Sequence, residues 1–277
     1  MAGSFAHRAR MLGRIATVWG RPGPDFIIIG AQKCGTTSLY TYIMRHPAVA
    51  PAMKRSLQFF DHGPSWAKGV LWYRAHFPFA PAWTAARGRS LVGECTPTYL
   101  FHPLGARRVH EATPAAKLIV MLRNPVDRTY SAYHHQRRAG FESLSFEEAI
   151  NREAERAGDE YLRLSTDPTF VSYPWRLHSY AGWGCYAEYL ESWLRTFGRD
   201  KLLILLNEEL AADPARVMGE VHAFLGLPPV CLDDYPRLNV GRYDMLDPHL
   251  RKRLVALFVP HNRRLALLLG RDPGWDA

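Results

Sequence analysis

The residues best placed to do chemistry form a short loop, Gly30-Ala-Gln-Lys-Cys-Gly35, which the hydroxyl residues 36–38 follow directly. An apolar run over residues 25–29 precedes the loop, and a helical pattern comes after it. At such a strand-to-helix junction, backbone N–H groups and the helix dipole together favour an anion. The residue order differs from the nucleoside-triphosphate loop, where Lys follows the second Gly and precedes a magnesium-binding Ser or Thr. We therefore predict a phosphate cradle with Lys33 inside the loop and no metal site, rather than an ordinary glycine-containing turn.

Arg123 and Ser131 form a second candidate anion site. Arg123 follows an apolar run over residues 117–122, and Ser131 lies about two turns into the helix expected next. Asn124 is a favourable N-cap for that helix, and Pro125 suits its first position. Arginine can hold a phosphate through two parallel hydrogen bonds, and a hydroxyl can add a directed one. Taken alone, Arg123 is weak evidence, since a salt bridge to a neighbouring carboxylate is the usual explanation of such an arginine.

Glu94 is the carboxylate that the predicted fold brings to the same place. It ends an apolar run over residues 90–94. Because the carboxyl ends of parallel strands lie at one edge of a sheet, Glu94 should converge with the loop and Arg123. A carboxylate there can act as a general base or as a magnesium ligand. An isolated Glu at a strand end is more often solvated or paired, so the convergence is what favours function.

The elements that must position these residues follow from hydrophobic patterning. Four apolar runs are typical of buried parallel strands: residues 25–29, 90–94, 117–122 and 201–206. Helices are predicted over residues 36–46, from 125 to about 139, and over 185–197, 214–225 and 248–259. The alternation indicates an α/β fold, a single P-loop-like domain with a central parallel β-sheet flanked by helices. We expect residues 1–23 to be a flexible basic segment, residues 24–277 the domain, and residues 141–182 a helical and loop-rich lid that contacts substrate.

The composition limits the class of protein and the kinds of ligand that the chain could bind. The 277 residues carry 35 Lys and Arg against 26 acids, a formal charge of +9, and 47% of them are hydrophobic, which excludes a disordered chain. The basic excess suits nucleic acid, an anionic membrane, an acidic polymer or a phosphorylated ligand. The four cysteines form no CxxC pair, and no apolar stretch is long enough to cross a bilayer. We expect a soluble cytoplasmic protein without a structural zinc site.

Taken together, these motifs resemble those of sulfotransferases that use 3′-phosphoadenosine 5′-phosphosulfate (PAPS). Residues 24–47 are similar to the family's 5′-phosphosulfate loop, and residues 122–131 to its 3′-phosphate motif, with Arg and Ser at the family's spacing. Further matches resemble the heparan sulfate branch, N- and 3-O-, and its soluble bacterial relatives: residues 58–61, 69–74, 94–99, 186–194, 239–242 and 274–276. The similarity runs from about residue 24 to the end of the chain.

The resemblance implies a role for each matching residue. The acceptor would attack the sulfur of PAPS in line, Glu94 would take its proton, and Lys33 would stabilise the departing 3′-phosphoadenosine 5′-phosphate (PAP). A free Glu has a pKa of about 4.3, so Glu94 needs burial to be an effective base. The implied cofactor-binding residues are Gln32, Lys33, Cys34, Gly35, Thr36, Thr37, Ser38, Arg123, Ser131, Gly241 and Arg242. No metal is required.

The acceptor is less defined than the donor. We expect a hydroxyl or amine of a glycan or small metabolite, and no nucleic-acid partner and no membrane span. The candidate acceptor contacts are Lys54, Cys95, His102, Trp183 and Tyr186. The heparan sulfate branch often has Lys where this chain has Cys95, and an acidic residue after the Lys where it has Arg55.

Two alternatives remain open from the sequence. In a P-loop kinase or NTPase, Glu94 would be a metal ligand and ATP binding would need magnesium. In a non-catalytic basic module that binds an acidic polymer, binding would depend steeply on salt and would not depend on Glu94.

Overall fold

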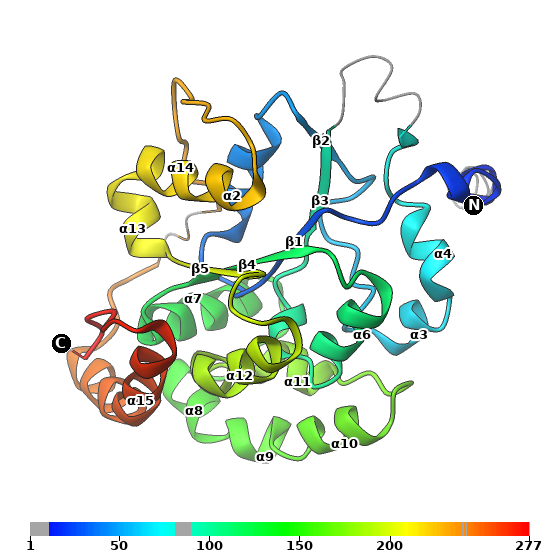
Figure 1. Ribbon diagram of the computed structural model, residues 1–277. Helices are drawn as coiled ribbons and strands as arrows, with labels where there is room; N and C mark the ends of the chain where they lie inside the picture. The colour runs from blue at the N-terminus through cyan, green and yellow to red at the C-terminus, as the bar shows by residue number, and fades with distance from the viewer. Residues whose placement is uncertain (1–10, 81–89, 240, 242, 277) are drawn as a thin grey trace.

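Five apolar segments pair side by side into one parallel sheet at the centre of this computed structural model (Figure 1). The structure describes residues 11–80, 90–239, 241 and 243–276. The strands are β1 (Phe26–Gly30), β2 (Val49–Pro51), β3 (Leu91–Cys95), β4 (Lys117–Leu122) and β5 (Leu202–Leu206). Their order across the sheet is β2-β3-β1-β4-β5, so the first strand lies at the centre. The predicted α/β class with a central parallel sheet is confirmed.

The sequence predicts four of these strands to within one residue and misses β2. This strand has only three residues, lies at the edge of the sheet and ends at Pro51. A proline lacks the N–H that a ladder needs, which confines it to edges and strand ends. Three residues are too few to show a periodicity, so no sequence pattern marks β2.

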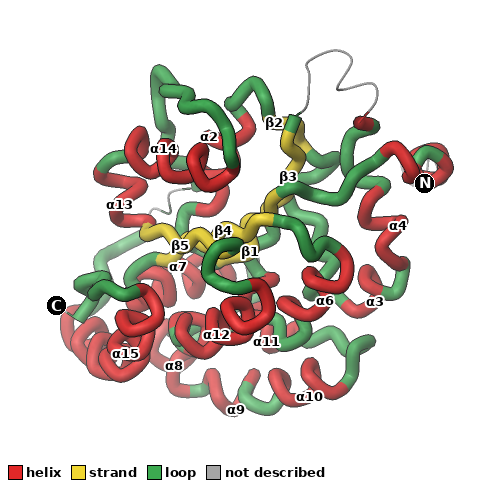
Figure 2. The backbone as a smooth tube through the Cα atoms, viewed as in Figure 1, coloured by secondary structure: helices red, strands yellow, loops and turns green. Residues whose placement is uncertain are grey.

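Helices cover both faces of the sheet, as Figures 1 and 2 show. On one side lie α2 (Thr36–Met44), α13 (Asn207–Ala212) and α14 (Pro214–Leu225). On the other side lie α6 (Gly105–Ala112), α7 (Pro125–Arg138), α12 (Tyr186–Phe197) and α15 (Pro248–Leu269). The chain also forms four shorter elements: the helices α3 (Gly63–Trp66) and α4 (Gly69–Arg74), and the 3-10 turns Val18–Gly20 and Tyr99–Phe101.

The pairing register brings the candidate site residues together. In the ladder between β1 and β3, Ile27 lies opposite Glu94. In the ladder between β1 and β4, Gly30 lies opposite Val120. Because all strands run in the same direction, the segments after β1, β3, β4 and β5 emerge at one edge of the sheet. The convergence expected from the sequence therefore follows from strand order.

The C-terminal helix is longer than the sequence predicts. It runs through Pro260 to Leu269, whereas the prediction ends it at residue 259. Proline removes one helical hydrogen bond, but here its ring faces solvent. The carbonyl that loses its partner is therefore open to water, and the helix continues. Among the described residues, no helix combines the length and apolar character that crossing a bilayer requires.

Residues 141–182 form a row of short helices on the outer side of α12 (Figure 1). These are α8 (Phe146–Asn151), α9 (Glu153–Ala157), α10 (Glu160–Thr166) and α11 (Tyr173–His178), and the 3-10 turn Gly182–Gly184 follows. At the N-terminus, Arg14 and Arg21 donate hydrogen bonds to backbone carbonyls of Ala75 and Phe77, so residues 11–23 contact the domain. The first ten residues of the predicted flexible segment lie outside the described residues.

Packing at the centre of the sheet predicts a sensitivity to one added methyl group. A Cβ at Gly93 would lie 2.3 Å from the ring of Phe26, which is fully buried in the neighbouring strand. Gly93→Ala should therefore lower the free energy of unfolding by about 1–3 kcal/mol, measured by urea denaturation. Gly219→Ala is the control, since nothing lies within 4 Å of its added Cβ in the interior of α14. That variant should gain about 0.5–1 kcal/mol. An unchanged midpoint for Gly93→Ala would contradict the close packing.

Candidate active site

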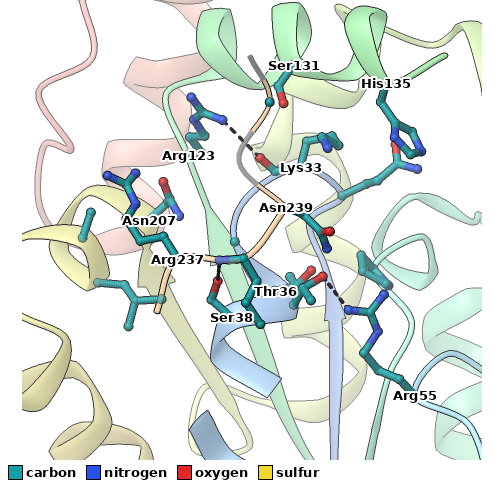
Figure 3. A pocket seen from close by; sticks show the side chains of 18 of the residues that line it. Lys33, Thr36, Ser38, Arg55, Arg123, Ser131, His135, Asn207, Arg237 and Asn239 are labelled. Atoms are coloured by element: carbon teal, nitrogen blue, oxygen red, sulfur yellow. Dashed lines mark hydrogen bonds between the residues drawn. The ribbon is translucent and has the colours of Figure 1, made fainter. Parts of the chain in front are cut away.

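A cavity of about 850 Å³ opens at the carboxyl edge of the sheet (Figure 3). Segments after β1, β3, β4 and β5 contribute to its wall, together with described residues of a later loop: Tyr235, Arg237, Leu238, Asn239, Gly241 and Tyr243. Its charged lining residues, among those described, are all basic: Lys33, Arg55, Arg123, Arg138 and Arg237, with His135 beside them. No carboxylate belongs to the described lining. A cavity of this size and charge suits a phosphorylated small molecule.

Three side-chain donors hold the phosphate loop. Arg128 donates from Nε to the Gln32 carbonyl at 3.2 Å, and Arg123 from Nη1 to the Lys33 carbonyl at 3.5 Å. Asn207 donates from Nδ2 to the Cys34 carbonyl at 3.2 Å. These bonds fix the orientation of three consecutive peptide groups. Each of the three carbonyls has a side-chain donor, so none is left as an unpaired acceptor in the loop.

The start of α2 completes the loop. Gly35 occupies its N-cap position with φ +87°, where no side chain caps the helix, and the first turn carries no acid. The N–H groups of residues 36–38 are therefore left for an external acceptor. Lys33 also has a positive φ, +70°, which non-glycine residues adopt rarely and mostly at functional sites.

Clustered positive charge favours an anion in the cavity. Burial and the neighbouring Arg138 and Arg123 lower the pKa of Lys33 below its ordinary value. Burial and the repulsion among these groups disfavour the protonated amine. A bound polyanion would relieve that repulsion, so the same groups that oppose each other become a binding surface.

The second predicted anion pair lies in the same cavity. Arg123 and Ser131 both line it, and Figure 3 shows them on one side with Arg55 across from them. The side chain of Asn124 accepts hydrogen bonds from the first N–H groups of α7, as the sequence predicts. This cap fixes the start of α7, the helix that carries Ser131, and Asn124 itself lies two residues after the end of β4 and next to Arg123.

Glu94 lies close to the cavity but not on its surface. Its side chain is fully buried and is absent from the cavity lining. Oε1 accepts from the hydroxyls of Tyr73 (2.7 Å) and Tyr99 (3.1 Å). Oε2 accepts from the Thr96 hydroxyl (2.7 Å) and the Leu57 N–H (3.3 Å). Burial outweighs these four hydrogen bonds and raises the pKa of Glu94 to about 7.

The predicted donor-binding residues are brought together, with two exceptions. The cavity is lined by Gln32, Lys33, Gly35, Thr36, Thr37, Ser38, Arg123, Ser131 and Gly241. Cys34 is fully buried behind the loop, where its Sγ lies 3.5 Å from the Tyr186 hydroxyl and burial raises its thiol pKa to about 11. Arg242 lies outside the described residues.

The five predicted acceptor contacts lie away from the cavity surface. Cys95 and Tyr186 are buried in the core, and the Tyr186 hydroxyl donates to the Arg123 carbonyl at 2.9 Å. Trp183 stacks on Phe101, with ring centroids 4.3 Å apart. His102 lies beside Trp183 at a small separate cavity, and burial with nearby arginines lowers its pKa to about 3. Lys54 is exposed but does not line the main cavity.

The structure adds residues that sequence reasoning did not select. Asn207 is the first residue of α13 and follows β5 directly, so a polar residue at that strand end was the available signal. Arg138 and Ser131 are two turns apart on α7, a spacing that places them on one face. Arg237 lies in an irregular loop, and Ser38 fixes that loop by accepting a hydrogen bond from the Leu238 N–H at 3.0 Å. Nothing in its local sequence marks Arg237 as a cavity residue.

Among the described residues, one group of three side chains could hold a metal ion: Cys185, Glu188 and His261. It lies where α12 meets α15, and none of its members lines the cavity.

Comparisons with known proteins agree on one family. The model of the sulfotransferase domain family matches residues 23–236. The chain is 31% identical to mouse heparan sulfate glucosamine 3-O-sulfotransferase 6, over 91% of this chain and 74% of that protein. It is 27% identical to the membrane-associated sulfotransferase kil1 of Dictyostelium discoideum, over 91% of this chain and 66% of that protein. It is also 34% identical to mouse bifunctional heparan sulfate N-deacetylase/N-sulfotransferase 4, over 74% of this chain and 22% of that protein.

The chain thus spans about two thirds of kil1 and about a fifth of the bifunctional enzyme. Among solved structures, a sulfotransferase from Alicyclobacillus acidocaldarius is 33% identical, with a TM-score of 0.68. That match covers 92% of this chain and all of the other.

The loop geometry predicts the effect of one substitution on anion binding. In Gly35→Ala, the new Cβ would lie 2.3 Å from Asn207 Nδ2, and the positive φ adds roughly 1–2 kcal/mol of backbone strain. We expect PAP affinity, measured by calorimetry, to fall at least about tenfold, a loss of about 1.4 kcal/mol. Gly69→Ala is matched for φ, at +80°, but its Cβ would meet open space. It should be strained yet bind PAP normally; equal affinities for the two variants would refute the role of the Asn207 contact.

Proposed function

We propose that this chain, which belongs to the sulfotransferase domain family, transfers the sulfuryl group of PAPS to a hydroxyl or amine of a glycan or small metabolite. Its enzyme class is that of the sulfotransferases, and the family implies PAPS as the donor. One observation supports the proposal that the donor binds in the cavity. A cavity whose described lining holds five cationic side chains and no carboxylate surrounds a loop in which three consecutive carbonyls accept hydrogen bonds from side chains.

The residues present fit a doubly phosphorylated, sulfated nucleotide. Thr36, Thr37 and Ser38 offer hydroxyls and backbone N–H groups at the start of α2 to the 5′-phosphate. Arg123 and Ser131 lie together for the 3′-phosphate. The donor supplies a sulfuryl group activated by its phosphate leaving group. Lys33 is placed in the loop to stabilise negative charge that develops on that group.

We infer that Glu94 is the general base. It lies at the carboxyl end of β3, in register with the strand that leads into the phosphate loop. Burial raises its pKa to about 7, so it can both hold and release a proton near neutral pH. The loop segment that covers it, residues 55–58, also contributes Arg55, Ser56 and Gln58 to the cavity wall.

A glycan acceptor is favoured over a small metabolite by the relatives. Two of the similar proteins are named for action on heparan sulfate. Arg55 faces the cavity across from Arg123, and it is placed to attract an anionic group of such an acceptor. A kinase would require oxygen ligands for magnesium, and the described lining offers no carboxylate for that role.

Donor binding can be tested before the acceptor is known. PAP at a free concentration of 100 times its Kd should stabilise the protein by about 2.7 kcal/mol, and EDTA should not change this effect. Lys33→Ala and Arg123→Ala should reduce the thermal shift strongly, because each removes a cation from the cavity. Arg195→Ala removes an exposed arginine of α12 outside the cavity and should leave the shift intact. The donor assignment fails if PAP produces no stabilisation of the parent protein.

The base assignment predicts a pH dependence. Glu94 accepts a proton only when ionised, so turnover should fall as pH drops below about 7 and level off above it. Glu94→Gln should bind PAP normally but lose about 10²–10⁴-fold in turnover. The assay measures transfer from radiolabelled PAPS to a panel of glycans, lipids and cell-extract metabolites, with mass analysis of the products. It gives both the pH dependence of turnover and the turnover of Glu94→Gln. Undiminished turnover in Glu94→Gln would remove it from this role.

A further inference from the structure

We propose that Ser56 and Thr96 form a relay that carries the acceptor's proton from the cavity to Glu94. The inference rests on the proposed role of Glu94 as base. It answers a geometric problem of the site, since the carboxyl group is fully buried and absent from the cavity lining. The cavity surface therefore gives an acceptor no direct access to the Glu94 carboxyl group.

A continuous line of hydroxyl groups joins the cavity to the carboxylate. Ser56 lines the cavity. Its Oγ lies 3.2 Å from Thr96 Oγ1, and Thr96 Oγ1 lies 2.7 Å from Glu94 Oε2. Thr96 is itself fully buried, so solvent does not compete for its hydroxyl. The link from Thr96 to Glu94 has the usual O–H···O length of about 2.5–3.0 Å, and the link from Ser56 to Thr96 is slightly longer.

The hydrogen-bonding capacity of these groups fixes the direction of transfer. A hydroxyl has one proton and two lone pairs, and Thr96 donates its only hydroxyl proton to a hydrogen bond with Glu94 Oε2. Thr96 Oγ1 also accepts from the backbone N–H groups of Leu57 at 3.1 Å and Gln58 at 3.5 Å. Because Thr96 has no second proton to give, Ser56 is the donor in the pair of hydroxyls when Glu94 is ionised. The lone pairs of Ser56 are then available to a proton donor in the cavity.

The other oxygen of Glu94 offers no comparable route. Oε1 accepts from Tyr73 and Tyr99, which are both fully buried and do not line the cavity. Burial and the adjacent carboxylate raise the pKa of both phenols well above the ordinary value, so they hold their protons. These two donors orient the carboxylate and leave Oε2 as the oxygen in line with Ser56.

The acceptor oxygen or nitrogen forms a bond to sulfur while the bond from sulfur to the bridging phosphate oxygen breaks, and that oxygen keeps the electron pair. The acceptor's proton passes to Ser56 Oγ, the Ser56 proton to Thr96 Oγ1, and the Thr96 proton to Glu94 Oε2. Glu94 ends protonated, and both hydroxyls keep one proton but now point toward the cavity. Release of one proton through the same line restores the starting state.

Substitutions that remove each hydroxyl test the relay in the full chain. Ser56→Ala and Thr96→Val should each lower kcat by about 100-fold or more, within the range of general-base contributions, with PAP affinity unchanged. Ser56→Thr and Thr96→Ser keep the hydroxyl and should restore most of the activity. Ser192→Ala and Thr113→Val are the controls, since these hydroxyls bond carbonyls on α12 and at the end of α6, outside the cavity. Both controls should turn over like the parent protein.

Combined variants separate a relay from a structural effect. If Thr96 acts through Glu94, Thr96→Val should cause no further loss of kcat in a Glu94→Gln background, because the proton has no destination there. Fully additive losses would overturn the relay, as would normal kcat in Ser56→Ala and Thr96→Val when Glu94→Gln is inactive. In that second case the acceptor reaches Glu94 directly, and the base role stands. Normal turnover in Glu94→Gln would instead refute the proposed base itself.

Discussion

The candidate site depends on the orientation of three consecutive peptide groups. Arg128, Arg123 and Asn207 each donate to a carbonyl of residues 32–34, and they come from α7, the end of β4 and the start of α13. A short loop with free peptides would present oxygens as easily as N–H groups, and oxygens repel phosphate. The charged donors on two of these carbonyls make stronger hydrogen bonds than neutral ones. Anion recognition by the loop is therefore imposed by neighbouring elements rather than by the loop sequence alone.

Glu94 illustrates how burial and hydrogen bonding oppose each other. Four donors stabilise its carboxylate, which would by itself lower the pKa, yet complete burial raises the pKa to about 7. The balance leaves a carboxyl group that changes its protonation state near neutrality without leaving its enclosure. Such a group is held in a fixed orientation by its surroundings, which limits the reorganisation that proton transfer would otherwise require.

Much of this arrangement follows from sequence, because parallel strands in a buried sheet are continuous apolar runs. Residues 25–29, 90–94, 117–122 and 201–206 have that pattern, and the chemistry lies just after them. Strand β2 has too few residues to show a hydrophobic pattern. Pro260 predicts the end of a helix, and only the structure shows that it lies on the solvent side of α15, where the helix can continue.

Within the site, the burial of individual side chains could not be predicted from the sequence. Trp183 and Tyr186 lie near polar segments in sequence but pack into the core, and Arg237 reaches the cavity from an irregular loop. Sequence patterns show which elements meet at the sheet edge. They do not show which side chains at that edge point outward.

The position of β1 at the centre of the sheet has a consequence for biosynthesis. The loop after this first strand is fixed by Asn207, which lies 173 residues further along the chain. The described cavity wall also includes Gly241 and Tyr243, so the chain as far as residue 243 must leave the ribosome before this wall can close. A nascent chain therefore carries its phosphate loop through most of translation without the partners that shape it. Nucleotide binding would then report that synthesis and folding of the domain are nearly complete.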